Sequence, residues 1–260
     1  MTLIETNGTR LRYRFDGPQD APVLLFSNSL CTRLEMWDEQ VEFFAGPYRV
    51  LRYDKRGHGE SEVPPGPYTF DVLSRDILGL LDALDLDKVD YCGLSMGGMS
   101  GQWLAANAPE RFGKMVLANT AAEIGPESLW VERIALARKA GMAGMTEGTV
   151  ERWFTADFRS QSSPALDKVR EMIRTTPLEG YVACCEAIRD MDLRPLLPSI
   201  KVPVMVLIGE QDPATTPAHG EFIADRIPGA ERHVLPGVAH LSNVQDPDAF
   251  NKAVAGFLLG

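Results

Sequence analysis

The sequence predicts an α/β protein with a mostly parallel central sheet, helices on both faces of the sheet and one helical insertion. Short aliphatic runs alternate along the chain with amphipathic segments of helical period, which is typical of a parallel sheet with crossover helices. The later apolar runs lead directly into polar loops. The alternation is interrupted once, by a long stretch with helical patterns and no clear strand.

The individual elements follow from this pattern in chain order. A hairpin and a more buried strand are expected around "LRYRF" and "APVLLFS" near the N-terminus. Further strands are expected at 48–54, 88–95, 114–120, 202–212 and 231–240. Helices are expected at 70–84, 96–108, 217–226 and 246–258. In the first of these helices the apolar residues recur at helical spacing, as in Leu73, Ile77 and Leu80.

The interruption covers residues 122–197, a segment rich in Arg, Ala, Met and Trp. Several amphipathic helical patterns follow one another there, so we expect a helical cap above the carboxyl edge of the sheet. Residues 1–121 and 198–260 would then form one α/β core. A chain of 260 residues has room for such a core with one insertion.

Composition excludes several classes of function. The formal net charge of −10 argues against a nucleic-acid partner, which would need a basic face. No apolar run approaches the roughly 18 residues of a membrane-spanning helix, and the N-terminus has no basic start followed by an apolar segment. Four cysteines without metal-ligand spacing are expected to be reduced thiols, so no metal site and a cytoplasmic location are predicted. Oligomeric state is not readable from the sequence.

The stretch "YCGLSMGG" contains the pattern G-x-S-x-G around Ser95. An apolar strand precedes this serine and a helix follows it, the context in which a nucleophilic serine sits on a tight strand-to-helix turn. Gly93 and Gly97 would let the backbone pass close to its neighbours there. A plain glycine-rich turn is the alternative, and the surrounding elements favour the nucleophile.

A serine hydroxyl needs an adjacent base and a third group that orients the base. Of the four histidines, His240 falls after the last predicted strand and is our candidate base. The acid should follow a strand between the nucleophile and the base. Asp212 does so, before Pro213, whereas Glu123 is the competitor one strand earlier. The order Ser95, Asp212, His240 favours Asp212.

Acyl transfer also needs hydrogen-bond donors for the developing oxyanion. The chain resembles the α/β-hydrolase family in the order of its triad residues, in the segment "YDKRGHGES" and in its expected helical cap. The resemblance implies two backbone donors, the N–H of Met96 and the N–H of Leu30 in "SNSLCT". Many members have His-Gly where this chain has Asn28-Ser29, so a serine side chain stands where the backbone is usually bare. Cys31 is expected to be a small packing residue.

Four further segments span most of the chain, cap included, and resemble 3-oxoadipate enol-lactonases of the β-ketoadipate pathway. They are "FSNSLCTRLEMW", "ERWF", "GYVACCEAIRDMDLR" and "AHLSNVQDP". The resemblance implies a serine hydrolase that opens an enol lactone with an acetate arm to 3-oxoadipate, without a metal or organic cofactor. The free carboxylate of such a small anionic substrate calls for a cation. Arg133 is expected to bind it, with Arg138 as the other candidate and Trp130 and Trp153 as apolar walls.

Two other classes of function stay open at this point. A carboxylesterase, a perhydrolase or a carbon–carbon bond hydrolase could use the same triad, because substrate choice depends on the site and the cap. A non-catalytic small-molecule receptor of the same fold is less favoured because Ser95, Asp212 and His240 are all present.

Overall fold

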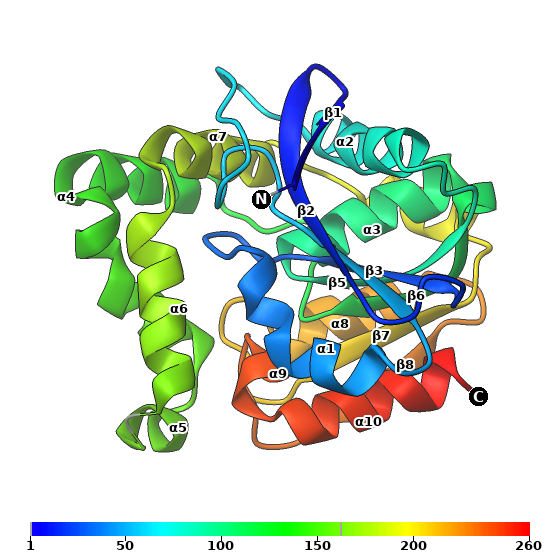
Figure 1. Ribbon diagram of the computed structural model, residues 1–260. Coiled ribbons are helices and arrows are strands. Elements are labelled where there is room, and N and C mark those ends of the chain that lie inside the picture. The colour runs from blue at the N-terminus through cyan, green and yellow to red at the C-terminus, as the bar shows by residue number, and fades with distance from the viewer. Residues whose placement is uncertain (1, 162) are drawn as a thin grey trace.

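The central sheet has the order β1-β2-β4-β3-β5-β6-β7-β8 in the computed structural model, which describes residues 2–161 and 163–260 (Figure 1). Its strands are β1 (Thr2–Thr6), β2 (Thr9–Asp16), β3 (Val23–Ser27), β4 (Arg49–Tyr53), β5 (Val89–Leu94), β6 (Phe112–Ala118), β7 (Val204–Gly209) and β8 (Glu231–Leu235). The β1–β2 hairpin and the β2–β4 pair are antiparallel, and all other neighbours are parallel. The predicted α/β class with a mostly parallel sheet is confirmed.

Burial explains which strands occupy the centre. Every residue of β7 is buried, and β3 and β5 are each buried except for one partly exposed residue near the start, so these runs carry apolar side chains on both faces. The edge strands β1 and β8 are mostly exposed. Phe26 pairs with Cys92 and Ser27 with Gly93. This register places the loop after β3 beside the turn after β5.

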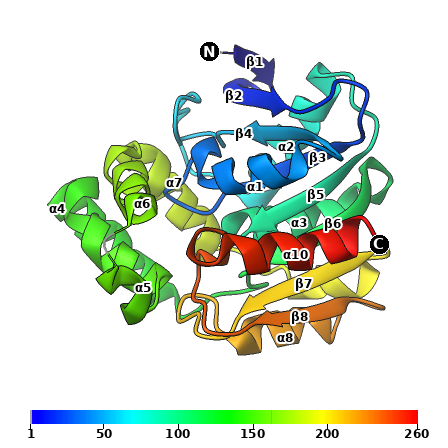
Figure 2. The same ribbon diagram turned by 60° about the horizontal axis from the view of Figure 1, so that its bottom comes forward.

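Helices cover both faces of the sheet (Figure 2). One face is covered by α2 (Phe70–Ala83), α3 (Met96–Asn107) and α8 (Pro217–Ala224), and the other by α1 (Asp38–Phe44) and α10 (Pro247–Leu258). Shorter elements are α9 (Ser242–Gln245), η1 (Leu34–Trp37), η2 (Pro109–Arg111) and η3 (Arg194–Ser199). In α2 the side chain of Thr69 accepts a hydrogen bond from Val72 N and caps the helix.

Among the described residues, four α-helices lie between β6 and β7 in the chain, before η3. They are α4 (Glu127–Trp153), α5 (Ala156–Ser160), α6 (Pro164–Thr175) and α7 (Leu178–Arg189). In both views α4, α5 and α6 stand beside the sheet rather than on one of its faces (Figures 1 and 2). No helix in the described part of the chain is long and apolar enough to cross a membrane.

Helix α4 is bent at Gly141, whose φ of 65° and ψ of 173° are not helical. Glycine adopts this conformation without the steric cost that a Cβ would add. The bend divides α4 into two arms, residues 127–140 and 142–153, which point in different directions.

The structure differs from the sequence expectations mainly at short elements. The helices η1 and α1 were not anticipated, although they bury a large side chain: Trp37 is fully buried and stacks on Phe26 with 4.5 Å between ring centroids. The strand expected at 202–212 ends at Gly209, because Glu210 and Gln211 instead donate backbone hydrogen bonds to Leu235 and Val238. The strand expected at 231–240 ends at Leu235, and residues 236–240 form the loop that carries His240. The remaining predicted helices and strands begin and end within a few residues of their expected bounds.

Candidate active site

Ser95 occupies the turn between β5 and α3 with a φ of 58° and a ψ of −114°, a conformation rare for any residue other than glycine. Its N–H donates to Ala118 O at 2.8 Å, and Thr120 Oγ1 donates to Ser95 O at 2.8 Å. A Cβ at Gly97 would collide with the Ser27 carbonyl group, which is why this turn needs a glycine there. The neighbouring strands therefore hold the backbone of Ser95 in its strained conformation.

The three predicted triad residues form one hydrogen-bonded chain. Ser95 Oγ lies 2.9 Å from His240 Nε2, and His240 Nδ1 lies 2.8 Å from Asp212 Oδ2. His240 comes from the loop after β8, and Asp212 from the loop after β7. All three side chains are nearly buried. The arrangement lets His240 take a proton from the serine hydroxyl while Asp212 fixes the imidazole tautomer.

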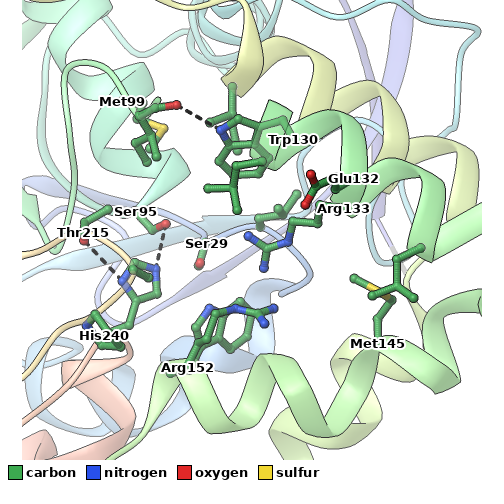
Figure 3. Close-up of a pocket in the computed structure, with 18 residues that line it drawn as sticks. Ser29, Ser95, Met99, Trp130, Glu132, Arg133, Met145, Arg152, Thr215 and His240 are labelled. Carbon is green, nitrogen blue, oxygen red and sulfur yellow. Dashed lines mark hydrogen bonds between the residues drawn. The ribbon is translucent and has the colours of Figure 1, made fainter. Parts of the chain in front are cut away.

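Asp212 is held as a carboxylate by its surroundings. Burial alone would raise its pKa, but the interaction with His240 and hydrogen bonds from Thr215 lower the pKa below its ordinary value. Oδ2 accepts from Thr215 Oγ1 at 2.7 Å and from Asn119 Nδ2 at 3.0 Å, and Oδ1 accepts from the N–H groups of Ala214 and Thr215. Thr215 Oγ1 also lies 3.3 Å from His240 Nδ1 (Figure 3). The competitor Glu123 lies outside this network, 3.9 Å from Arg194.

The loop after β3 brings Leu30 beside the nucleophile turn. Both Leu30 and Met96 are buried. Met96 is the first residue of α3, so its N–H has no partner within the helix, and in the described part of the chain Leu30 N–H also has none. Two free N–H groups beside Ser95 suit the role of oxyanion donors.

Ser29 is accommodated in this loop with its side chain against the cavity. Its side chain is fully buried and lines the same cavity as Ser95 and Arg133 (Figure 3). Its Oγ makes no hydrogen bond within the described residues. The extra side chain is therefore directed at the cavity, where it adds a hydroxyl group.

Polar side chains fix the conformation of this loop. Asn28 Nδ2 donates to Tyr53 O at 2.7 Å, and Trp37 Nε1 donates to Asn28 Oδ1 at 2.9 Å. Cys31 N–H donates to His58 Nε2 at 3.0 Å, and Lys55 Nζ donates to Ser29 O at 2.5 Å. Burial and the charge of Lys55 keep the pKa of His58 well below its ordinary value of 6.5, so His58 is neutral and can accept this bond.

Cys31 lies in this loop with a φ of 60°, a backbone conformation that favours glycine. Its thiol is buried, and burial raises the pKa of Cys31 far above its ordinary value. A thiol that stays protonated is a poor nucleophile. The geometry agrees with Cys31 as a packing residue.

A cavity of about 410 Å³ opens above Ser95 and His240. The core supplies the triad end of the cavity, and α4 supplies much of the rest, including Trp130, Arg133, Met145 and Trp153. Trp153 stands next to the base, with 6.1 Å between its ring centroid and that of His240. The cavity is thus mostly apolar, with its polar groups gathered near the triad and on α4.

Two arginines reach this cavity from the two arms of α4 (Figure 3). Arg133 donates from Nε to Tyr181 Oη at 3.0 Å and lies over the Trp130 ring, and Arg152 donates to Thr149 Oγ1 at 3.2 Å. Within residues 2–161 and 163–260, neither guanidinium is within 4.0 Å of a carboxylate. Burial and the neighbouring charge of Arg133 lower the pKa of Arg152. Two like charges without an ion pair within 4.0 Å favour an anion at this end of the cavity, which the Glu132 carboxylate also lines (Figure 3).

The sequence analysis named Arg133, which does line the cavity, but not Arg152, and the carboxylate-binding role of Arg133 stays a prediction. Arg138, the other candidate, points elsewhere and pairs with Glu179 at 3.3 Å on the exposed side of α4. Arg152 belongs to the "ERWF" segment, but a straight α4 would separate it from Arg133 by roughly 28 Å. The hydrophobic periodicity of the segment does not indicate the bend that brings Arg133 and Arg152 together. The roles of His58 and Lys55 were missed for a similar reason, because both act on a loop far away in the sequence.

A family model described as "alpha/beta hydrolase fold" matches residues 22–247. The chain belongs to the alpha/beta hydrolase fold family. For this hydrolase, the position of Ser95 after a central parallel strand, with His240 and Asp212 on later loops, agrees with the family's order of triad residues.

Two curated relatives and one solved structure, all enol-lactonases, are similar to this chain over nearly its whole length. This hydrolase is 44% identical to 3-oxoadipate enol-lactonase 2 of Acinetobacter baylyi, over 94% of this chain and 91% of that protein. It is 37% identical to 3-oxoadipate enol-lactonase 1 of the same organism, over 96% and 94% of the two chains. The crystal structure of the enol-lactonase from Burkholderia xenovorans superimposes with a TM-score of 0.97 and 45% identity, over 100% of both chains.

Proposed function

We propose that this protein hydrolyses 3-oxoadipate enol-lactone to 3-oxoadipate through an acyl-enzyme on Ser95. The observation that carries the proposal is the pair Arg133 and Arg152, two unpaired cations in the same cavity as the triad. A neutral ester would leave both charges without a counterion, whereas a lactone with a free carboxylate supplies one. The similarity to two 3-oxoadipate enol-lactonases supports the same substrate.

In the first half-reaction Ser95 Oγ attacks the ring carbonyl carbon while His240 Nε2 takes the hydroxyl proton. The negative charge then develops on the former carbonyl oxygen, where the N–H groups of Leu30 and Met96 would stabilise it. Collapse of this intermediate breaks the ring C–O bond and expels an enolate oxygen. That oxygen takes the proton from His240, and the enol rearranges to the ketone.

The second half-reaction releases the acid. His240 Nε2 takes a proton from water, the hydroxide attacks the ester carbon, and Ser95 leaves with the returned proton. Because the substrate is cyclic, the leaving group stays attached to the acyl chain, so the acyl-enzyme contains every heavy atom of the lactone. The cavity must therefore hold the whole opened chain while water enters.

Substrate orientation would come from the cap. We propose that residues 122–197 form this cap on a core made of residues 1–121 and 198–260. Arg133 and Arg152 would bind the carboxylate of the acetate arm, and a guanidinium gives such an anion charge-assisted hydrogen bonds with a fixed direction. Trp130 and Trp153 would pack against the ring and the arm. The four free, buried thiols fit a reducing cytoplasm.

The test is turnover of the enol lactone beside p-nitrophenyl acetate, for the wild type and for Ser95→Ala. We expect the lactone to have the higher kcat/KM, and Ser95→Ala to lose at least ~10³-fold with both substrates, because nucleophile removal abolishes the acyl-enzyme route. Efficient ester turnover with no lactone activity would refute the substrate. Substantial activity of Ser95→Ala would refute the mechanism.

A further inference from the structure

Lys55 is a buried cation that the mechanism above does not use. It lies in the loop after β4, is 5% exposed and makes no ion pair within the described residues. The hydrogen bond from Nζ goes to the carbonyl oxygen of Ser29 at 2.5 Å. Burial of an unpaired ammonium costs the folded state free energy, so its presence needs a reason other than stability.

The carbonyl that Lys55 contacts belongs to the peptide group joining Ser29 to Leu30. The same peptide group carries the N–H of Leu30, which lines the same cavity as Ser95 and is the expected oxyanion donor. Thr32 adds two neutral donors to the Ser29 oxygen, Oγ1 at 2.8 Å and N–H at 3.4 Å. The carbonyl and N–H of one amide are conjugated. A cation that draws electron density onto the oxygen therefore makes the N–H more positive and a stronger donor.

We propose that Lys55 is a positioning residue of the oxyanion hole, whose ammonium polarises the Ser29–Leu30 peptide and strengthens the hydrogen bond from Leu30 N–H to the tetrahedral intermediate. The proposal rests on the proposed function only for acyl transfer at Ser95 with Leu30 as a donor. It does not depend on which ester or lactone is the substrate. The oxyanion hole thereby gains a full positive charge that never touches the substrate.

The charge of Lys55 is expected to titrate near neutral pH. Burial lowers the pKa of Lys55 from its ordinary value of 10.5 to about 8. The groups that influence the pKa of Lys55 are Asp54 on the same loop, Cys31 on the loop after β3 and Cys184 on α7. The charge of Lys55 in turn acts on His58. Burial raises the pKa of Cys184 to about 12 and that of Cys31 further, so both thiols stay neutral.

His58 and Asp54 also keep one charge state across this range. His58 is neutral because its pKa is well below 6.5. Burial raises the pKa of Asp54 above its ordinary value of 3.8, but the N–H groups of Glu60 and Leu34 donate to its carboxylate and oppose this rise. Lys55 is therefore the group in this set that changes charge near pH 8. The ammonium is present below this pH and lost above it, so kcat should fall on the alkaline side.

The experiment compares wild type, Lys55→Met and the control Thr32→Val, with p-nitrophenyl acetate from pH 5.5 to 9.5 and spontaneous hydrolysis subtracted. Lys55→Met removes the charge and keeps the volume, whereas Thr32→Val removes only a neutral donor to the same oxygen. Since loss of a whole oxyanion donor costs ~10²–10³ in kcat, we expect about a tenfold loss in Lys55→Met and a smaller one in Thr32→Val. Among these three proteins, the alkaline fall near pH 8 should be absent from Lys55→Met and present in the wild type and in Thr32→Val.

Binding measurements separate transition-state from ground-state effects. Benzeneboronic acid forms a tetrahedral adduct with an active serine, whereas adipate mimics the opened dicarboxylate chain. In Lys55→Met the Kd for the boronate should rise by the same factor as kcat falls, and the Kd for adipate should stay unchanged. An unchanged kcat, an alkaline fall that persists without Lys55, or equal weakening of both ligands would overturn the proposal.

A second variant covers the case in which Lys55→Met does not fold, which circular dichroism and cooperative unfolding would reveal. Lys55→Gln keeps a neutral donor, so it should also lose the alkaline fall while retaining more activity than Lys55→Met would. Failure of the lactone assay leaves these ester and boronate results intact, so an error in the substrate and an error about Lys55 are distinguishable.

Discussion

Replacing Lys55 by Met should make the protein more stable at neutral pH, although it makes the enzyme slower. A tenfold change in proton affinity corresponds to about 1.4 kcal/mol, so lowering the pKa of Lys55 from 10.5 to about 8 costs the folded state roughly 3 kcal/mol. Met fills a similar volume without a charge. Against this gain stands the lost charge-assisted hydrogen bond to Ser29 O, worth about 1.5 kcal/mol because Thr32 still donates to the same oxygen. A gain of roughly 1.5 kcal/mol remains.

The pH dependence of this gain has a definite sign. Below pH 8 both folded and unfolded chains carry the charged lysine, and the full cost is present. Between about pH 8 and 10.5 the folded wild type has released the proton while the unfolded chain still binds it, so wild-type stability rises relative to the variant. The advantage of Lys55→Met should therefore be largest below pH 8 and shrink towards pH 10.5.

The assay is urea unfolding of both proteins at pH 7 and pH 10, with thermal unfolding as a second measurement. Using the difference between the two proteins cancels the other groups that titrate at alkaline pH. For a chain of this size we expect the melting temperature of Lys55→Met to be higher by roughly 3–6 °C at pH 7. A variant less stable than wild type at pH 7, or a difference independent of pH, would refute the argument that Lys55 is buried at a cost.

Two further predictions concern the substrate site and the triad. Arg152→Gln should raise KM for the lactone by ~10–100-fold, since a charge-assisted hydrogen bond contributes ~1.5–3 kcal/mol, with little effect on p-nitrophenyl acetate. Arg138→Gln is the matched control and should leave KM unchanged for both the lactone and p-nitrophenyl acetate, because Arg138 pairs with Glu179 outside the cavity. Equal effects of Arg152→Gln on the two substrates would argue against carboxylate binding. Asp212→Asn should lower kcat by ~10⁴-fold at neutral pH with unchanged circular dichroism, because the amide favours the wrong imidazole tautomer. A loss below ~10-fold would contradict the triad assignment.

The sequence predicted the sheet and the members of the hydrogen-bonded triad because each leaves a local pattern. A central strand such as β7 is apolar at every position, and Ser95 lies in a five-residue pattern imposed by its turn. The loops that carry Asp212 and His240 follow strands, so their place in the fold could be inferred from chain order. For these residues the local sequence pattern is enough to predict where the side chain lies in the fold.

The residues that were missed act through contacts that sequence spacing does not encode. His58 and Lys55 matter because they hydrogen-bond to the backbone of Cys31 and Ser29, which requires the loops after β3 and β4 to meet. Arg152 matters because α4 is bent, and neither arm indicates the bend by its own periodicity. Such contacts become visible only when the chain is folded.

The bend at Gly141 also makes the spacing between two charges depend on one backbone conformation. Space does not limit this position, since a Cβ there would meet no atom within 4 Å, so only the positive φ selects glycine. Any change that straightens α4 would carry Arg152 away from Arg133 without altering a single residue that lines the cavity. A change at this one residue outside the pocket is therefore expected to shift the preference of a related enzyme from anionic to neutral substrates, and a comparison of pocket residues alone would not detect it.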